Sequence, residues 1–174
     1  MLEATILAGQ MQAELPSKTV AGFDLRGADK LQQMGFFNKD SADFERLVDR
    51  TVQSVASRGN VMVMSLTGEQ RLILFPEYGG EVFFYENDRS LPARYHFRLD
   101  LSEASVLTVR INSIGGVHAL SAAGLAEHYI IKRDFDLAGG QGCVRGGAEQ
   151  QRVPGHHLQS GAAPHAEDRG PQSR

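Results

Sequence analysis

Apolar residues in the first part of the chain recur at helical spacing, and further along the pattern changes to alternation. In residues 1–15 they lie three or four positions apart, at Ala4, Leu7, Ala8, Met11 and Leu15. This spacing predicts an amphipathic helix. Pro16 cannot continue the helical hydrogen-bond ladder, so we expect the helix to end there and a strand to follow over residues 19–25.

From residue 51 onward the apolar period is two, which is typical of strands. The clearest example is 96–101, where Phe97, Leu99 and Leu101 are predicted to point inward and His96, Arg98 and Asp100 outward. Turn-forming residues divide the region into predicted strands at 51–57, 61–66, 71–75, 82–85, 96–101, 107–112 and 117–120.

Between the first strand and this region, residues 30–37 are predicted to be irregular. A short helix is expected after Asp40 or Ser41, either of which can cap it, with Phe44, Leu47 and Val48 on one side. Many short strands at close spacing favour an antiparallel sandwich or barrel. The predicted fold class is therefore α+β and β-rich: an antiparallel β-sandwich with an N-terminal helix and a second short helix.

The pattern stops near residue 134. Residues 135–174 are rich in glycine, proline and histidine and carry almost no apolar spacing, so we predict a folded domain over 1–134 and a disordered tail over 135–174. We also hypothesise that this tail is an out-of-frame or read-through translation. A search of the other reading frames of the gene tests this idea, because a continuation of the folded domain must then be found in one of them.

Composition narrows the function classes. With 18 basic and 21 acidic residues the net charge is −3, which gives no overall electrostatic reason to bind nucleic acid, although a local basic face is compatible with it. The single cysteine, Cys143, excludes a disulfide framework and an all-cysteine zinc site. The spacing of His156, His157 and His165 fits no zinc template, so we expect no metal and no cofactor. The sequence contains neither an apolar run of the ~20 residues a membrane span needs nor a signal peptide, and we expect a cytoplasmic location.

Five short stretches carry a resemblance to a known family. They are Met1-Leu-Glu3, Pro16-Ser-Lys-Thr-Val20, Arg58-Gly-Asn60, Tyr78-Gly-Gly80 and Leu107-Thr-Val-Arg-Ile-Asn-Ser-Ile-Gly-Gly116. In order and spacing, the chain over roughly residues 1–130 resembles the N-terminal catalytic domain of the formamidopyrimidine-DNA glycosylase / endonuclease VIII family. The resemblance implies a β-sandwich with two flanking helices. The family's helix-two-turn-helix module and zinc finger have no counterpart in these residues, so we expect a truncated form.

The resemblance also implies a function. In this family an N-terminal amine attacks the sugar C1′ of a damaged nucleotide, expels the base and forms a Schiff base that undergoes β-elimination. Carried over to this chain, Met1 or a processed Leu2 supplies the amine, and Glu3 matches the catalytic glutamate. The implied partner is damaged double-stranded DNA, with no membrane and no small-molecule cofactor involved. The implied function is a DNA glycosylase/AP lyase of base excision repair.

The DNA-binding positions depart from the family pattern. The family's nucleophilic proline falls at Leu2 and its phosphate-contacting lysine at Asn60. The wedge methionine falls at Tyr78, and the paired arginines and phenylalanine of the second wedge loop fall at Asn112, Ser113 and Ile114. The implied DNA-binding residues are Arg58, Asn60, Tyr78, Asn112, Ser113 and Ile114.

Other interpretations of these residues stay open. A glutamate at position 3 is stabilised by the helix dipole in any protein. Tyr78 beside two glycines fits a packed turn, and Arg58 and Arg110 fit solvated charges at strand ends. The alternative function is therefore a catalytically inactive, truncated remnant: a β-sandwich that binds DNA or a protein weakly.

Overall fold

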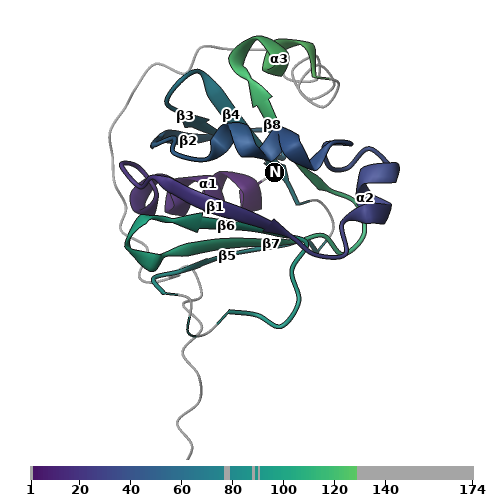
Figure 1. Ribbon diagram of the computed structural model, residues 1–174, viewed down its shortest axis with the longest axis horizontal. Coiled ribbons are helices and arrows are strands. Elements are labelled where there is room, and N and C mark those ends of the chain that lie inside the picture. Colours follow the sequence, from purple (N-terminus) through teal and green to yellow (C-terminus); the bar gives the residue numbers. More distant parts are fainter. Residues whose placement is uncertain (1, 77–78, 88, 90, 129–174) are drawn as a thin grey trace, which may run out of the picture.

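Two four-stranded antiparallel sheets form the body of the part of the chain that the computed structural model describes, which comprises residues 2–76, 79–87, 89 and 91–128. One sheet has the order β1 (Val20–Leu25), β6 (Phe97–Leu101), β7 (Val106–Arg110), β5 (Glu81–Tyr85). The other has the order β2 (Val52–Arg58), β3 (Val61–Leu66), β4 (Gln70–Phe75), β8 (Gly116–Ser121). Figure 1 shows the two sheets as separate layers. The predicted α+β, β-rich sandwich is confirmed; the predicted tail over 135–174 lies outside the described residues.

The alternation seen in the sequence sets which side chains form the core. In β6, Phe97, Leu99 and Leu101 are buried while Arg98 and Asp100 are partly exposed. The register follows the same order, with Leu99 opposite Phe23 of β1 and Leu107 of β7. A shift by one residue would turn the apolar set outward, so the alternation fixes the register.

The N-terminal helix forms as predicted and covers one part of the sandwich. Helix α1 (Leu2–Glu14) buries Ala8 and Met11, and Leu15 after its last turn is also buried. It packs mainly on β2, where Gln12 Oε1 accepts a hydrogen bond of 2.5 Å from the Val55 N–H. Pro16 follows directly, as expected of a residue that cannot extend the helix.

Phe44 lies at the centre of the core on the predicted short helix, a 3₁₀ helix labelled η1 (Ser41–Leu47). The Asp40 side chain caps it by accepting a 2.9 Å hydrogen bond from the Ala42 N–H. The Phe44 ring lies 5.7 Å from that of Phe23 and 5.2 Å from that of Phe97, centroid to centroid. Aromatic rings at such distances pack in tilted arrangements, so Phe44 joins strands β1 and β6 to η1.

The helices differ from the prediction in two places. Helix α2 (Asp29–Gln33) occupies residues expected to be irregular, and α3 (Ala122–Glu127) was not predicted. A one-turn 3₁₀ helix, η3 (Ser102–Ala104), fills the turn between β6 and β7. Helix α2 is held by tertiary contacts, since the Gln32 side chain donates to the Asn38 carbonyl at 3.0 Å and to the Ser41 hydroxyl at 3.2 Å. Among the described helices, none has the length and apolar character needed to cross a membrane.

Candidate nucleic-acid interface

The sheet topology brings those sequence-predicted site residues that the structure describes to one end of the sandwich. Strands β4 and β8 pair with Phe75 opposite Gly116, and β5 and β7 pair with Glu81 opposite Arg110. The two connections between the sheets, which follow β4 and β7, therefore join neighbouring strand ends, and Gly79 of the first lies close to the second. The Asn112 amide confirms this proximity by donating a hydrogen bond to the Gly79 carbonyl. We call this end of the sandwich the crossover end.

The β2–β3 hairpin and the start of α1 belong to the same end. Val61 begins β3, and its neighbour Met62 lies opposite Leu74 in β4, which places the hairpin turn beside the end of β4. The Ser57 hydroxyl lies 3.4 Å from that of Thr5 in the first turns of α1. The positive φ of 60° at Gly59 suits the tight two-residue turn.

At this end the predicted residues are mostly exposed. Glu3 lies in the first turn of α1, and Arg58 and Asn60 lie on the hairpin. Asn112, Ser113 and Ile114 form an exposed turn, and 42 % of the Ile114 surface is accessible although it is apolar. Met1 and Tyr78 lie outside the described residues, and of Leu2 only the helical backbone is described. The topology thus brings Glu3, Arg58 and Asn60 to the same end as the 112–114 turn.

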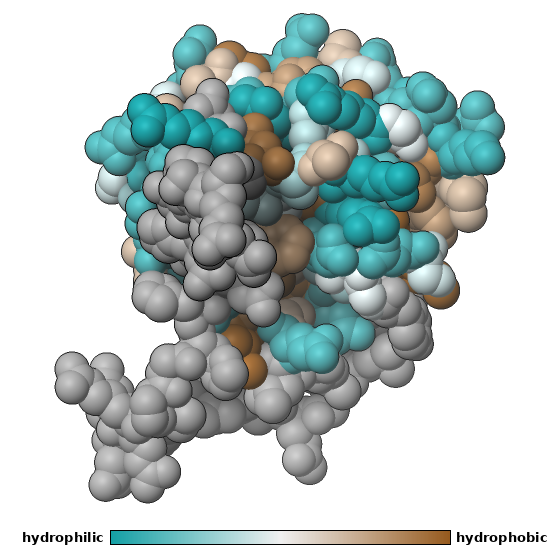
Figure 2. Space-filling model, turned by 90° about the horizontal axis from the view of Figure 1, so that it is seen from below, coloured by the Kyte–Doolittle hydropathy of each residue, from teal (hydrophilic) through white to brown (hydrophobic). Residues whose placement is uncertain are grey.

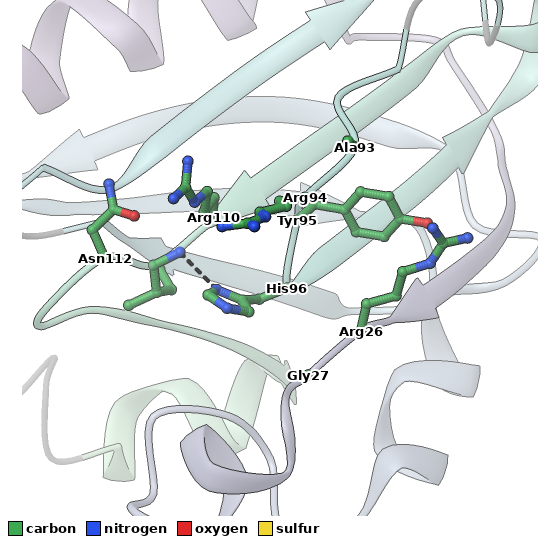
Figure 3. Close-up of a pocket in the computed structure, with 9 residues that line it drawn as sticks. Arg26, Gly27, Ala93, Arg94, Tyr95, His96, Arg110 and Asn112 are labelled. Carbon is green, nitrogen blue, oxygen red and sulfur yellow. Dashed lines mark hydrogen bonds between the residues drawn. The ribbon is translucent and has the colours of Figure 1, made fainter.

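A cleft next to that turn was not predicted from the sequence. It has a volume of about 430 Å³ and lies where β1 ends, β6 begins and β7 ends (Figure 3). Its lining residues are Arg26, Gly27, Ala93, Arg94, Tyr95, His96, Arg110, Ile111 and Asn112. Three guanidinium groups and one imidazole therefore line it, and no carboxylate does. Such a surface favours anions, above all carboxylates and phosphates, which match the planar fork of arginine.

At one side of the cleft a buried tyrosine positions Arg26. The Tyr95 hydroxyl donates to Asp24 Oδ2 at 2.7 Å, and Arg26 Nε donates to the same oxygen at 2.9 Å. The Arg26 guanidinium lies 4.7 Å from the centre of the Tyr95 ring, within cation–π range. The hydrogen bond from Tyr95 holds the pKa of Asp24 below its usual value, and burial raises the pKa of Tyr95. Asp24 therefore stays ionised and fixes both neighbours.

At the other side the cations are held less firmly. Arg110 Nη1 lies 3.5 Å from Glu81 Oε2, and both side chains are about two-fifths exposed, with 38 % accessible for each. A pair at that distance and exposure contributes little to stability. Arg94 makes no ion pair with any residue that the structure describes. Both guanidinium groups are thus available to an incoming anion.

His96 links the cleft to the exposed turn. Its Nδ1 accepts a 3.0 Å hydrogen bond from the Ile111 N–H, drawn as the dashed line in Figure 3. Burial, together with the charge of Arg110, lowers the pKa of His96 below its ordinary 6.5. The ring is therefore neutral near neutral pH and holds the residue that begins the 111–115 connection.

The sequence contained only part of this site. Alternation along 96–101 predicted an outward-facing His96, and Arg110 was identified as a strand-end charge. Arg26 and Arg94 follow no local pattern, because they come from segments that join only through the β1–β6 pairing. Among the described residues no group of three or more histidine, cysteine or acidic side chains could hold a metal ion. The histidines and cysteine of the tail lie outside those residues.

The fold has counterparts among solved structures of Fpg and MutM in complex with DNA. The matched structures include an LlFpg protein in complex with a THF-DNA and an inhibitor (12 % identity, TM-score 0.63) and MutM with DNA containing carbocyclic 8-oxo-G (13 % identity, TM-score 0.62). A third is the Lactococcus lactis Fpg with an abasic-site DNA (11 % identity, TM-score 0.61).

The chain shares the fold of about half of an Fpg or MutM chain. The matches cover 75 %, 75 % and 76 % of this chain and 47 %, 48 % and 46 % of the respective Fpg or MutM chains, so it spans about half the length of the structures it matches. No protein-family model matches the chain, and no curated protein sequence does. The resemblance noted in the sequence is thus borne out at the level of the fold.

Proposed function

We propose that this protein binds damaged double-stranded DNA at its crossover end and acts there as a DNA glycosylase/AP lyase of the Fpg/MutM type. The observation that carries the proposal is the convergence of the α1 start, the 58–60 hairpin and the 111–115 connection at one end of a sandwich with that fold. The Fpg and MutM structures it resembles were solved with DNA.

The arginine cleft provides the electrostatic part of the proposal. Asn60, Asn112 and Ser113 are uncharged where the family resemblance implies cations, so these three positions offer little attraction for phosphates. Arg26, Arg94 and Arg110 line a cleft that includes Asn112 itself. Each arginine that neutralises a backbone phosphate releases condensed counterions, and three such contacts give a salt slope of about −2.7 in log K against log salt for duplex DNA.

The chemical part of the proposal concerns the α-amine and Glu3. At an abasic site the unprotonated amine attacks C1′, water leaves, and a Schiff base forms. Removal of a C2′ proton then breaks the C3′–O bond and releases the 3′ phosphate. We assign the amine to Met1 or a processed Leu2, and the proton transfers to Glu3. An α-amine with a pKa of about 8 retains a free-base fraction near neutral pH.

One observation favours a second candidate, a DNA-binding sandwich without catalytic activity. Asn60, Asn112 and Ser113 lack the charges that would hold the lesion strand against the amine. In that case the arginine cleft still binds backbone phosphates, and no covalent intermediate forms. The two candidates therefore share the binding prediction and differ in the chemistry.

Borohydride trapping on abasic-site duplex DNA separates them. The catalytic proposal expects a covalent protein–DNA band that is lost when the α-amine is blocked by reductive methylation and is strongly reduced in Glu3→Gln. Absence of the band at saturating protein would eliminate the lyase and leave the binding sandwich. A band of equal intensity in Glu3→Gln would indicate unassisted amine chemistry.

DNA affinity measured over a series of salt concentrations tests the cleft. We expect Arg94→Gln to reduce the magnitude of the salt slope by about 0.9, as for the loss of one phosphate contact. The matched control is Lys18→Gln, which removes one positive charge far from the cleft. Lys18 pairs at 3.2 Å with Glu103, which follows the end of β6, whereas the cleft lies where β6 begins. An equal loss in both variants would show that only net charge matters and that the cleft is not the contact surface.

A further inference from the structure

His96 is held rigidly between two strands, and its ring faces a third segment. Its N–H donates to the Val109 carbonyl of β7 at 2.9 Å, and its own carbonyl accepts from the Arg26 N–H at 3.1 Å. With the backbone fixed on both sides, the ring has a defined position. From there Nδ1 accepts the hydrogen bond from the N–H of Ile111, the first residue after β7.

That hydrogen bond determines the state of the ring. A backbone N–H can donate only to a nitrogen with a lone pair, so Nδ1 carries no proton and the neutral ring carries it on Nε2. Protonation would place an N–H at Nδ1 against the N–H of Ile111, two donors facing each other. The contact therefore exists only while the ring is neutral.

The surroundings of His96 oppose protonation. Arg26 approaches from the end of β1, Arg110 from the end of β7, and Arg94 from the segment before the ring. Two carboxylates lie against these groups and both are already paired: Asp24 accepts hydrogen bonds from Arg26 and Tyr95, and Glu81 faces Arg110. None of the residues that line the cleft is acidic. Burial and, after it, the charge of Arg110 lower the pKa of His96 below its ordinary value, so the ring is neutral at neutral pH.

Ile111 is well placed to transmit this state. Its side chain is 4 % exposed and belongs to the main core cluster, while the next three residues form the exposed turn. Asn112 continues the anchor by donating to the Gly79 carbonyl of the neighbouring connection. The orientation of the Asn112–Ile114 turn thus depends on how the residue before it is held.

We propose that His96 is a positioning residue, whose neutral ring anchors the start of the 111–115 connection and orients the exposed Asn112–Ile114 turn, and whose protonation releases that turn. The consequence for DNA rests on the proposed function. Protonation adds a positive charge to the cleft, which on its own would strengthen DNA binding. Loss of the anchor acts in the opposite direction, so a fall in affinity on acidification would come from the turn and not from the charge.

The anchor can be tested without DNA, using the full chain and two substitutions. His96→Asn places an amide oxygen near the position of Nδ1, which keeps an acceptor that does not titrate. His96→Phe keeps a ring of similar size and removes the acceptor. The measurements are the nitrogen chemical shifts of the His96 ring and the protection factor of the Ile111 amide in hydrogen exchange, followed from about pH 7.5 to pH 4.5 across the titration range of histidine.

We expect an unprotonated Nδ1 at neutral pH and a protection factor for Ile111 that falls about tenfold as the ring titrates, the equivalent of one hydrogen bond. In His96→Asn the protection should persist without that titration, and in His96→Phe it should be low at every pH. A protonated Nδ1 at neutral pH, or the same pH profile in wild type and His96→Asn, would overturn the proposal. Because His96→Asn retains the acceptor, the test does not depend on whether His96→Phe folds.

Binding of abasic-site duplex under the same conditions distinguishes this inference from the proposed function. The inference expects the affinity of the wild type to fall on acidification and that of His96→Asn to change less. If the protection of the Ile111 amide changes with pH but no DNA binds at any pH, the proposed function is refuted and the role of His96 as the anchor of Ile111 is retained. If DNA binds and the affinities of wild type and His96→Asn change identically with pH, the role of His96 in orienting the turn is refuted.

Discussion

His118, the buried histidine of β8, should make the free energy of unfolding depend on pH by an amount that can be calculated. His118 is 6 % exposed, and its ring stacks on that of Phe75 at 5.7 Å with an angle of 9° between the planes. The centre of the His128 ring lies 4.5 Å from the centre of the His118 ring. The His118 Nε2 is buried and has no hydrogen-bond partner among the described residues. Burial, with a smaller contribution from His128, lowers the pKa of His118 from 6.5 to about 4.

The sign of the effect follows from the direction of that shift. The unfolded chain binds a proton at His118 below about pH 6.5, whereas the folded protein resists doing so until about pH 4. Between these values the unfolded state holds more protons, so the free energy of unfolding decreases as the pH falls. At 1.36 kcal/mol for each pH unit, the loss attributable to His118 is about 3 kcal/mol. That is a large part of the 5–15 kcal/mol typical of a whole domain, so it should be visible in a simple titration.

Urea denaturation at about pH 7 and pH 4, the two limits of the window, measures the effect in wild type and in His118→Phe. Phenylalanine keeps a ring against Phe75 and cannot titrate, so every other acid-sensitive group is common to both proteins. The wild type should lose about 3 kcal/mol more than the variant between the two pH values. Equal losses in the two proteins would refute the argument, because they would mean that His118 does not titrate differently in the folded and unfolded states. The absolute stability of the variant does not enter the comparison.

Substitutions at three further positions test the packing that supports the site. Gly116→Ala would place a Cβ 1.9 Å from the Phe36 carbonyl oxygen, and we expect a loss of about 3 kcal/mol in urea denaturation, with an unchanged midpoint refuting the close approach. Asn38→Ala removes a side chain that bonds both the N–H and the carbonyl of Ala119, at 2.8 Å and 3.0 Å; leaving these buried groups unpaired should lower the free energy of unfolding by about 3 kcal/mol in the same assay. Phe44→Ala should cost about 4 kcal/mol and Phe44→Leu distinctly less, as measured by thermal unfolding, because only the first leaves a large cavity.

The sequence predicted those parts of the fold in which the order of apolar and polar residues along the element follows which side chains are buried. Phe97, Leu99 and Leu101 alternate with polar residues because one face of β6 meets the core, and that alternation is visible without any partner. Helix α2 carries no such pattern. Its five residues include no buried side chain, and the preceding Ala28 offers no side-chain cap. It is helical because Gln32 reaches a segment six to nine residues away, which a search for periodicity does not detect.

Helix α3 is a different case, because a local signal was present. Ser121 caps it by accepting a 3.1 Å hydrogen bond from the Gly124 N–H, which is an ordinary N-terminal signature. The helix that follows has only six residues and contains a glycine, so its propensity is weak. Packing of Leu125 against the cluster of Val61, Ile73 and Phe75 provides the remaining stability. Tertiary contact, not local preference, decides this element.

The arginine cleft, formed by Arg26, Arg94 and Arg110, could not be predicted because these residues lie far apart in the sequence. Its cations come from residues 26, 94 and 110, and they meet only because the sheet order is β1–β6–β7. That order pairs strands separated by more than seventy residues, such as Leu25 with Phe97. The sequence alone indicates the turns, whose spacing resembles the family's, and shows uncharged Asn60, Asn112 and Ser113 where the family has cations. It could not show that the missing charge lies beside those turns.

At the crossover end, the side chains that would contact the DNA backbone differ from those that would reach into a lesion. The Asn112–Ile114 turn carries only uncharged side chains, including the exposed Ile114, whereas three guanidinium groups line the neighbouring cleft, where Arg26 pairs with Asp24 and Arg110 pairs more loosely with Glu81. Attraction to the backbone and insertion at a lesion would therefore depend on different residues. Substitution of Arg94 should change the salt dependence of binding with little effect on the preference for an abasic site, because phosphate contacts are present at every nucleotide. Substitution of Ile114 should do the opposite, and an equal effect of both on both properties would show that the tip and the cleft act as one surface.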